Sequence, residues 1–181
     1  MARRFAQFVI LCEDRLQAVF VRTYLMMRGI DRRRIVSRFA PSGIGSGEQF
    51  VRDQYAFQVE AHRRAVARRS GVLIVVIDAD NESVHHRLRQ LDKLLQASNQ
   101  TRRDRNERIG IFVPKRHIET WIRYASGMSV DEEGDYHSFG HNEREIVPHV
   151  RHLAREICRA PLPPNAPPSL VTACDELRRI F

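Results

Sequence analysis

Three acidic residues stand directly after apolar segments, at positions where strands are expected to end. Glu13 follows Phe8–Cys12, and Asp78 and Asp80 follow Val72–Ile77, an apolar and largely β-branched run. Such a run predicts a buried strand, and parallel sheets bind ligands beyond the carboxyl ends of their strands. Residues two apart on leaving a strand point to the same side, so Asp78 and Asp80 are expected to converge. Carboxylates in this arrangement predict a Mg²⁺ or Mn²⁺ site, and capping of the next turn is the alternative.

Two basic residues follow the next apolar segment, Ile109–Val113, after Pro114. Lys115, one of only two lysines in the chain, is the candidate for handling the proton or the developing charge of a phosphate reaction, and an ordinary solvated charge is the alternative. Arg116 can bind a phosphate through two hydrogen bonds. Glu119, one helical turn beyond Lys115, is a further candidate ligand, and pairing with a nearby arginine is the alternative.

A glycine-rich loop precedes the long helix expected from about residue 48 to residue 69. Backbone N–H groups at the start of a helix form a natural phosphate site, and a flexible connection is the alternative. The loop lacks the Gly-Lys-Ser/Thr ending of a nucleotide-binding P-loop, so we do not expect NTP hydrolysis in this chain. The residues predicted to bind phosphate or nucleic acid here are Ser42, Gly43, Gly45, Ser46 and Gly47.

Strand and helix patterns alternate along the chain, which predicts an α/β fold with a central, mostly parallel sheet covered by helices on both faces. The expected strands are Phe8–Cys12, Ile35–Phe39, Val72–Ile77 and Ile109–Val113. The expected helices are Leu16–Met27, Glu48–Arg69 with Phe50, Phe57 and Ala61 on one face, a leucine-rich helix through Leu95, Ile118–Tyr124, Pro148–Cys158 and a final helix capped by Ser169.

The domain organisation follows from the same patterns. We expect an α/β domain over residues 1–160, a proline-rich connector over 161–168 and a C-terminal helical extension over 169–181. The apolar face of that last helix is a candidate docking surface for a partner. The acidic segment 131–135 is expected to be a solvated loop.

Composition restricts the class of protein. The chain has 181 residues, 43% of them hydrophobic and 29% charged, which is typical of one soluble domain. No apolar run approaches the ~20 residues that a membrane-spanning helix needs. Three cysteines, odd in number and widely spaced, predict reduced thiols and a cytoplasmic protein. The net charge of +8 favours nucleic acid as a partner, although an arginine-rich composition can also reflect a GC-rich genome.

The acidic positions resemble those of a known domain. Glu13 after the first strand, a glycine-bearing loop after the second and Asp78-Ala79-Asp80 after the third are similar to the Toprim domain of topoisomerases, bacterial primases and OLD-group nucleases. The resemblance covers roughly residues 5–125. The segment Val113–Trp121 is similar to a stretch of small stand-alone Toprim-like proteins. The resemblance implies a Toprim/Rossmann-like fold in which Glu13, Asp78 and Asp80 hold the divalent metal that acts on a phosphodiester bond.

The sequence departs from that pattern at Gln17. OLD-type nucleases usually carry a second acidic residue at this position, four residues after the first-strand Glu, and Asp14 is the only nearby substitute. The ATPase region that OLD proteins carry in the same chain is also absent from this sequence.

These observations predict a Mg²⁺- or Mn²⁺-dependent nuclease acting on nucleic acid, on DNA more than on RNA. The resemblance is compatible with a separate ATPase subunit, with oligomerisation, and with a role in phage defence or DNA processing. A non-catalytic module that binds nucleic acid or a partner is the first alternative, and Gln17 favours it. A phosphatase of the haloacid-dehalogenase type is the second, because that class also uses Asp-x-Asp at a strand end, although on its first strand.

Overall fold

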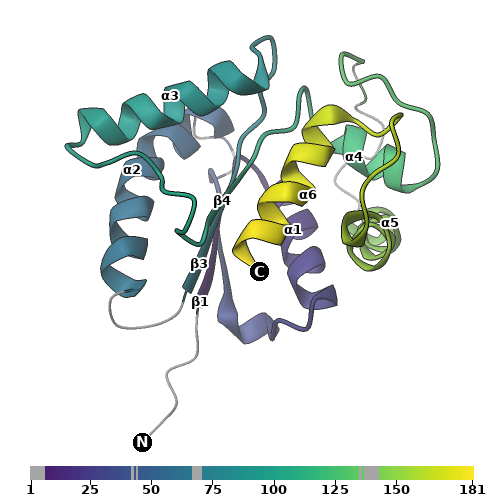
Figure 1. The fold of residues 1–181 in the computed structure, drawn as a ribbon, viewed down its shortest axis with the longest axis horizontal. Helices are drawn as coiled ribbons and strands as arrows, with labels where there is room; N and C mark the ends of the chain where they lie inside the picture. Colours follow the sequence, from purple (N-terminus) through teal and green to yellow (C-terminus); the bar gives the residue numbers. More distant parts are fainter. Residues whose placement is uncertain (1–6, 42, 44, 67–70, 135, 137–142) are drawn as a thin grey trace, which may run out of the picture.

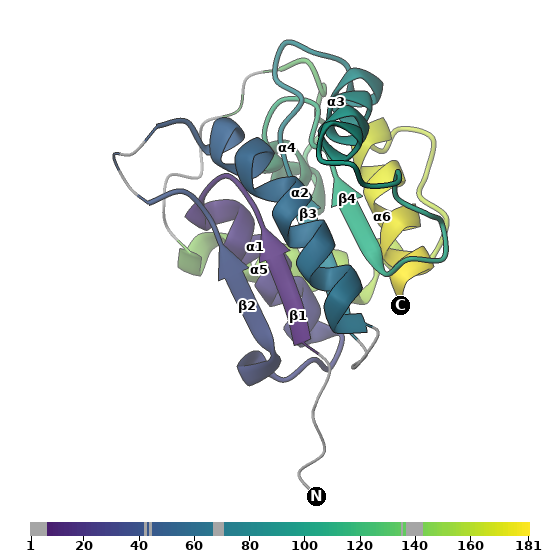
Figure 2. The same ribbon diagram turned by 90° about the vertical axis from the view of Figure 1, so that its left-hand side faces the viewer.

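A parallel sheet lies between two layers of helices in the computed structural model, which describes residues 7–41, 43, 45–66, 71–134, 136 and 143–181 (Figures 1 and 2). The strands are β1 (Gln7–Leu11), β2 (Ile35–Arg38), β3 (Gly71–Val76) and β4 (Ile109–Phe112). They form one four-stranded sheet in the order β2-β1-β3-β4, and every neighbouring pair is parallel. Leu11 at the end of β1 pairs with Val75 of β3, so these two strands end almost level. The predicted fold class is confirmed.

The helices divide between the two faces of the sheet according to the alternation of β3. Val72, Ile74 and Val76 face one core, and Leu73 and Val75 face the other. The first core is covered by α1 (Arg15–Met27), α4 (Ile118–Ala125), α5 (Glu143–Arg155) and α6 (Pro168–Ile180), with the short turns η1 (Arg32–Arg34) and η2 (Ile157–Arg159) at its margin. The second core is covered by α2 (Gly47–Val66) and α3 (Val84–Ala97). In the described part of the chain, no helix is long and apolar enough to cross a membrane.

The buried face of α2 differs from the sequence prediction. Val51, Tyr55 and Val59 are fully buried against the sheet, whereas Phe57 is 62% exposed. Two apolar stripes on this helix have helical spacing, and the stripe with two β-branched residues and a tyrosine is the one that packs on the strands. The predicted face of Phe50, Phe57 and Ala61 was therefore wrong for Phe57 and Ala61, which are exposed, whereas Phe50 packs against the second core.

Two helix starts also differ from their predictions. α5 begins at Glu143 and holds Pro148 inside it rather than at its start, which costs the helix one backbone hydrogen bond near its N-terminal end. α6 begins at Pro168 after the cap residue Pro167, and Ser169 lies within its first turn. Ser169 is therefore not at the cap position, and its hydroxyl instead accepts from the indole N–H of Trp121 at 2.9 Å and donates to Glu132.

The cysteines correct a further expectation. Cys158 of η2 and Cys174 of α6 form a disulfide, and Cys12 is a buried free thiol. The expectation of three reduced thiols was wrong for this pair. The packing of η2 on α6 brings the two sulfurs together, and the spacing of the cysteines in the sequence does not reveal it.

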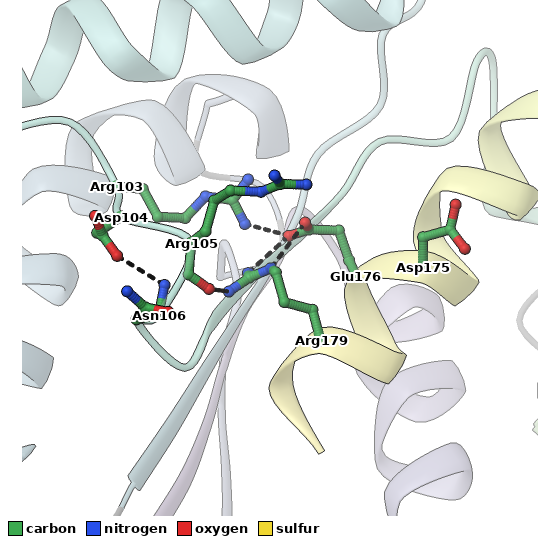
Figure 3. Close-up of a pocket in the computed structure, with 7 residues that line it drawn as sticks. All are labelled: Arg103, Asp104, Arg105, Asn106, Asp175, Glu176 and Arg179. Atoms are coloured by element: carbon green, nitrogen blue, oxygen red, sulfur yellow. Dashed lines mark hydrogen bonds and ion pairs between the residues drawn. The ribbon is translucent and has the colours of Figure 1, made fainter.

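α6 covers the edge of the sheet at β4. Its apolar side chains lie in the first core, so this face is not available for docking a partner. Its polar side faces the pocket of Figure 3, where Glu176 accepts a hydrogen bond from the backbone N–H of Ile111 at 3.1 Å. Arg103 and Arg179 both pair with Glu176 and donate to the Ile109 carbonyl. These contacts satisfy backbone hydrogen-bonding groups at the open edge of β4, to which another strand could otherwise pair.

Candidate metal and phosphate site

The order of the strands places one crevice where a ligand is expected. The chain passes from β1 outward to β2, then crosses back over β1 to β3 and continues outward to β4. In open parallel sheets, ligands bind beyond the carboxyl ends of the strands at the point where the direction of winding reverses. That point lies between β1 and β3. Glu13 lies just beyond the end of β1, and Asp78 lies just beyond the end of β3.

Glu13 and Asp78 meet directly at this point. Glu13 Oε1 accepts a hydrogen bond from the backbone N–H of Asp78 at 2.6 Å. Asp78 is only 8% exposed. The buried side chain of Gln17, in the first turns of α1, joins the two residues: its Nε2 donates to Asp78 Oδ1 at 2.9 Å, and its Oε1 accepts from the Glu13 N–H at 3.0 Å. One neutral amide therefore holds the two strand ends together.

A histidine and a buried arginine complete the surroundings of Asp78. His117 Nδ1 lies 3.8 Å from Asp78 Oδ2. Arg87 of α3 donates from Nε to the Asp78 carbonyl at 3.0 Å and pairs with Glu48 in the first turn of α2. A buried guanidinium requires such partners, and Arg87 uses them to join α2 and α3 to the end of β3.

Asp80 lies at the same edge but is turned outward. Its backbone has φ of 54°, a left-handed conformation that aspartate tolerates better than most residues. The alternation of an extended chain therefore does not apply to Asp80. Its side chain is 47% exposed, and its Oδ2 lies 4.0 Å from Arg87 Nη2.

Burial and neighbouring acidic groups disfavour the ionised forms of Glu13 and Asp78. Burial raises the pKa of Glu13, and the charges of Asp78, Asp80 and Asp14 act in the same direction. Burial also raises the pKa of Asp78; His117 opposes this shift, whereas Asp80 and Asp14 add to it. A half-buried Glu13 and a buried Asp78 whose pKa values are both raised are stabilised when a proton or a cation offsets their charge. Asp14 itself caps α1 by accepting from the Gln17 N–H at 2.8 Å.

The glycine-rich loop lies beside Glu13. Ser46 caps α2 by accepting from the Gln49 N–H at 3.1 Å, and the helix begins at Gly47. A Cβ atom at Gly47 would lie 2.7 Å from the Cβ and the carbonyl oxygen of Glu13, so only glycine permits this approach. Gly43 and Gly45 have positive φ angles of 81° and 66°. The predicted phosphate ligand Ser42 lies outside the described residues.

Lys115 and Arg116 lie next to Asp80 and share an acidic partner. Lys115 Nζ is 3.2 Å from Glu133 Oε2 and donates to the Asp80 carbonyl at 3.3 Å. Arg116 Nη2 is 3.6 Å from the same Glu133 oxygen. Glu133 is exposed, as expected for this acidic segment, and its carboxylate contacts both cations. Glu119 lies farther along, in the first turn of α4.

The donor set fits a magnesium-type ion better than a structural metal. Among the residues that the structure describes, no three His, Cys, Asp or Glu side chains are gathered as a metal-binding group. Mg²⁺, however, often binds through one or two carboxylates and completes its shell with water and substrate phosphate. The half-buried Glu13 and the buried Asp78 supply two carboxyl groups for such a shell, with Asp80 beside them.

Sequence reasoning missed most of the residues that surround the acids. Gln17 was noted only as a departure from a family pattern. The buried role of Arg87 could have been predicted, because Arg87 lies between Val84 and Leu91 on the apolar stripe of α3, where a charged residue needs buried partners. His117 and Glu133 gave no comparable signal.

A scan against protein-family models and searches of curated proteins and of solved structures found no match to this chain. The α/β class with a parallel four-stranded sheet is therefore the level at which the structure classifies the protein.

Proposed function

We propose that this chain is a Toprim-like nuclease that uses Mg²⁺ or Mn²⁺ to hydrolyse phosphodiester bonds in nucleic acid, preferentially DNA. The observation that carries this proposal is the contact of Glu13 with Asp78 at the winding reversal of the sheet. Asp80, Lys115 and the glycine-rich loop lie around the same point, so acidic, basic and phosphate-binding groups share one edge.

Each group has a distinct role in this proposal. Glu13 and Asp78, assisted by Asp80, hold the ion, and Gln17 ties the Asp78 carboxylate to the backbone N–H of Glu13. A bound ion of this kind activates water and stabilises the charge that develops on phosphate oxygens. Lys115 neutralises charge on the phosphate or the leaving oxygen, and Arg116 orients the phosphate through hydrogen bonds.

The proposed partners follow from the net charge of the chain and from the missing P-loop ending before α2. The net charge of +8 favours a polyanion. Because the loop before α2 has no Gly-Lys-Ser/Thr ending, any ATP-driven step would need a separate ATPase subunit. A cytoplasmic location suits action on cellular DNA, and the Cys158–Cys174 disulfide is the feature that fits this location least.

The test is cleavage of plasmid, single-stranded DNA and RNA by the purified protein in Mg²⁺, in Mn²⁺ and in EDTA. We expect cleavage only with metal, together with a metal-dependent rise in melting temperature that EDTA reverses. Absence of both cleavage and the melting shift would contradict the proposal. Release of phosphate from small esters without nucleic-acid cleavage would indicate a phosphatase instead.

A binding module without catalysis is the second candidate. Gln17 supplies an amide where an acid would add a ligand, and it occupies Asp78 Oδ1 at 2.9 Å. Salt-sensitive binding of nucleic acid with no turnover in either metal would favour this candidate.

Replacing Gln17 with Glu tests whether the neutral amide stabilises the ends of β1 and β3 when no cation is bound. The Gln17→Glu variant keeps the acceptor for the Glu13 N–H but loses the donor to Asp78, so we expect unfolding in EDTA to become easier by about 1–3 kcal/mol. A saturating divalent cation should restore much of this loss and give a larger melting shift than in the original chain. Gln96→Glu, an equal charge change at an exposed site on α3, should show neither effect. Equal metal shifts in all three proteins would contradict the prediction.

Replacing Glu133 with Gln should strengthen nucleic-acid binding. The variant removes the carboxylate that pairs with Lys115 and Arg116, so a phosphate no longer has to displace it. An exposed ion pair of this kind is worth up to about 1 kcal/mol, which predicts about fivefold tighter binding in a fluorescence-anisotropy titration. Glu60→Gln makes the same change in net charge at the exposed Arg64 pair on α2. A gain of the same size in Glu60→Gln would show that only net charge matters.

A further inference from the structure

A cluster of arginines lies near the amino ends of the strands, on the opposite side of the sheet from Glu13 and Asp78. The structure has a pocket of about 620 Å³ lined by Met27, Arg28, Gly29, Cys158, Arg159 and Arg178. Helices that join parallel strands run back from the carboxyl edge to the amino edge, and Arg28 is the residue that ends α1. The pocket is therefore separated from Glu13 and Asp78 by the length of the sheet.

The three arginines come from three different elements and converge. Arg28 ends α1, Arg159 ends η2, and Arg178 is in the last turn of α6. The buried hydroxyl of Tyr24 lies within electrostatic reach of all three: burial raises the pKa of Tyr24, and all three guanidinium groups act to lower it. The positive charges of Arg28 and Arg159 therefore add at one place, and Arg178 adds a guanidinium group whose charge Asp175 partly offsets.

Among the described residues, only Arg178 of this cluster has a carboxylate partner, Asp175. Arg103 and Arg179 surround Glu176, and Arg63 pairs with Glu107. By contrast, no acidic side chain lines the pocket, and in the described part of the chain Arg28 and Arg159 have no carboxylate partner.

Two of the cations are held in place by their surroundings. The Cys158–Cys174 disulfide joins η2 to α6, directly before Arg159 and one helical turn before Arg178. Arg178 also pairs with Asp175 and donates to the Ala160 carbonyl at 3.4 Å. A prepositioned guanidinium loses less conformational entropy when it binds an anion.

We propose that this pocket binds a phosphate group through Arg28, Arg159 and Arg178. Guanidinium groups match phosphate through paired hydrogen bonds, and three of them around an open hollow provide charge for a phosphate that carries more than one negative charge. The phosphate belongs either to a free phosphate compound or to a nucleic-acid backbone. The site does not depend on the nuclease proposal.

The test measures binding of pyrophosphate by calorimetry and of a labelled single-stranded oligonucleotide by anisotropy, using the full chain. The Arg28→Gln/Arg159→Gln variant should bind pyrophosphate at least about tenfold more weakly, because charge-assisted hydrogen bonds are lost. Arg89→Gln/Arg151→Gln removes the same charge from exposed positions on α3 and α5 and should bind as the original chain does. The Cys158→Ser/Cys174→Ser variant should bind more weakly than the original chain.

The outcomes distinguish a free phosphate compound from a nucleic-acid backbone, and the arginine pocket from the site at Glu13 and Asp78. Loss of pyrophosphate binding alone in the pocket variant identifies a free phosphate compound as the ligand, and parallel loss of oligonucleotide binding identifies a nucleic-acid backbone. Asp78→Asn should leave pyrophosphate binding unchanged whether or not it affects cleavage. Failure of the original chain to bind pyrophosphate and the oligonucleotide, or equal losses in the pocket and control variants, would overturn the proposal.

Discussion

The Asp78→Asn variant is expected to lose metal-dependent cleavage of nucleic acid by at least about a hundredfold, because a divalent ion contributes several kcal/mol of charge stabilisation to such a reaction. Asn has the shape of Asp and can still meet the Gln17 amide, so the ends of β1 and β3 should stay in contact. What the variant loses is the negative charge that, together with Glu13, attracts the cation. The measurement is the initial rate of plasmid cleavage in saturating Mg²⁺ or Mn²⁺.

Two controls make this result specific. Asp53→Asn changes the same functional group at an exposed site on α2 and should cleave at the original rate. Metal should raise the melting temperature of Asp53→Asn but not that of Asp78→Asn, which separates loss of the ion from loss of the fold. Cleavage by Asp78→Asn at the original rate would mean either that another site acts or that a contaminating nuclease is present, and in both cases the role given to Asp78 would be rejected.

The meeting of Glu13 and Asp78 could be predicted from the sequence because it depends on very little geometry. Each acid follows an apolar segment that is too short for a helix, and parallel strands present their carboxyl ends at one edge. Once β1 and β3 are neighbours in the sheet, as their register shows, the two acids must lie close together. Element type and strand direction were sufficient once the two strands were assumed to be neighbours, which the sheet order shows.

The contacts around the acids could not be predicted, because they depend on how helices and loops pack. Gln17 reaches Asp78 only because α1 packs at one particular angle, and Glu133 reaches Lys115 from a loop far along the chain. Asp80 illustrates the same limit. The alternation rule assumed an extended chain, and a left-handed residue directly after the strand turns the side chain outward.

The choice between two apolar stripes on α2 shows a second limit. Phe50, Phe57 and Ala61 have helical spacing, and so do Val51, Tyr55 and Val59. Spacing alone cannot rank the two stripes. The packing on the sheet decides between them: Val51, Tyr55 and Val59 are buried in the second core, while Phe57 faces solvent.

Trp121 should give the largest loss of stability of any single truncation considered for this chain. It is 1% exposed, lies 6.0 Å from the ring of Phe20, and donates its indole N–H to Ser169 Oγ at 2.9 Å, which joins α4 to α1 and α6. Trp121→Ala removes this volume from the first core, and such truncations cost about 3–5 kcal/mol. Because Trp121 is the single tryptophan of the chain, unfolding in urea should be followed by far-ultraviolet circular dichroism rather than by fluorescence.

Two further variants separate the causes of this loss. Trp121→Phe keeps most of the buried apolar volume but leaves the Ser169 hydroxyl without its donor, so it should cost about 1–3 kcal/mol. Phe57→Ala removes an equally aromatic side chain from α2 and should change stability by no more than about 0.5 kcal/mol, because Phe57 is exposed. A large loss in Phe57→Ala would restore the buried face that the sequence predicted for α2. That result would reject the orientation of α2 described above, which also places Gly47 against Glu13.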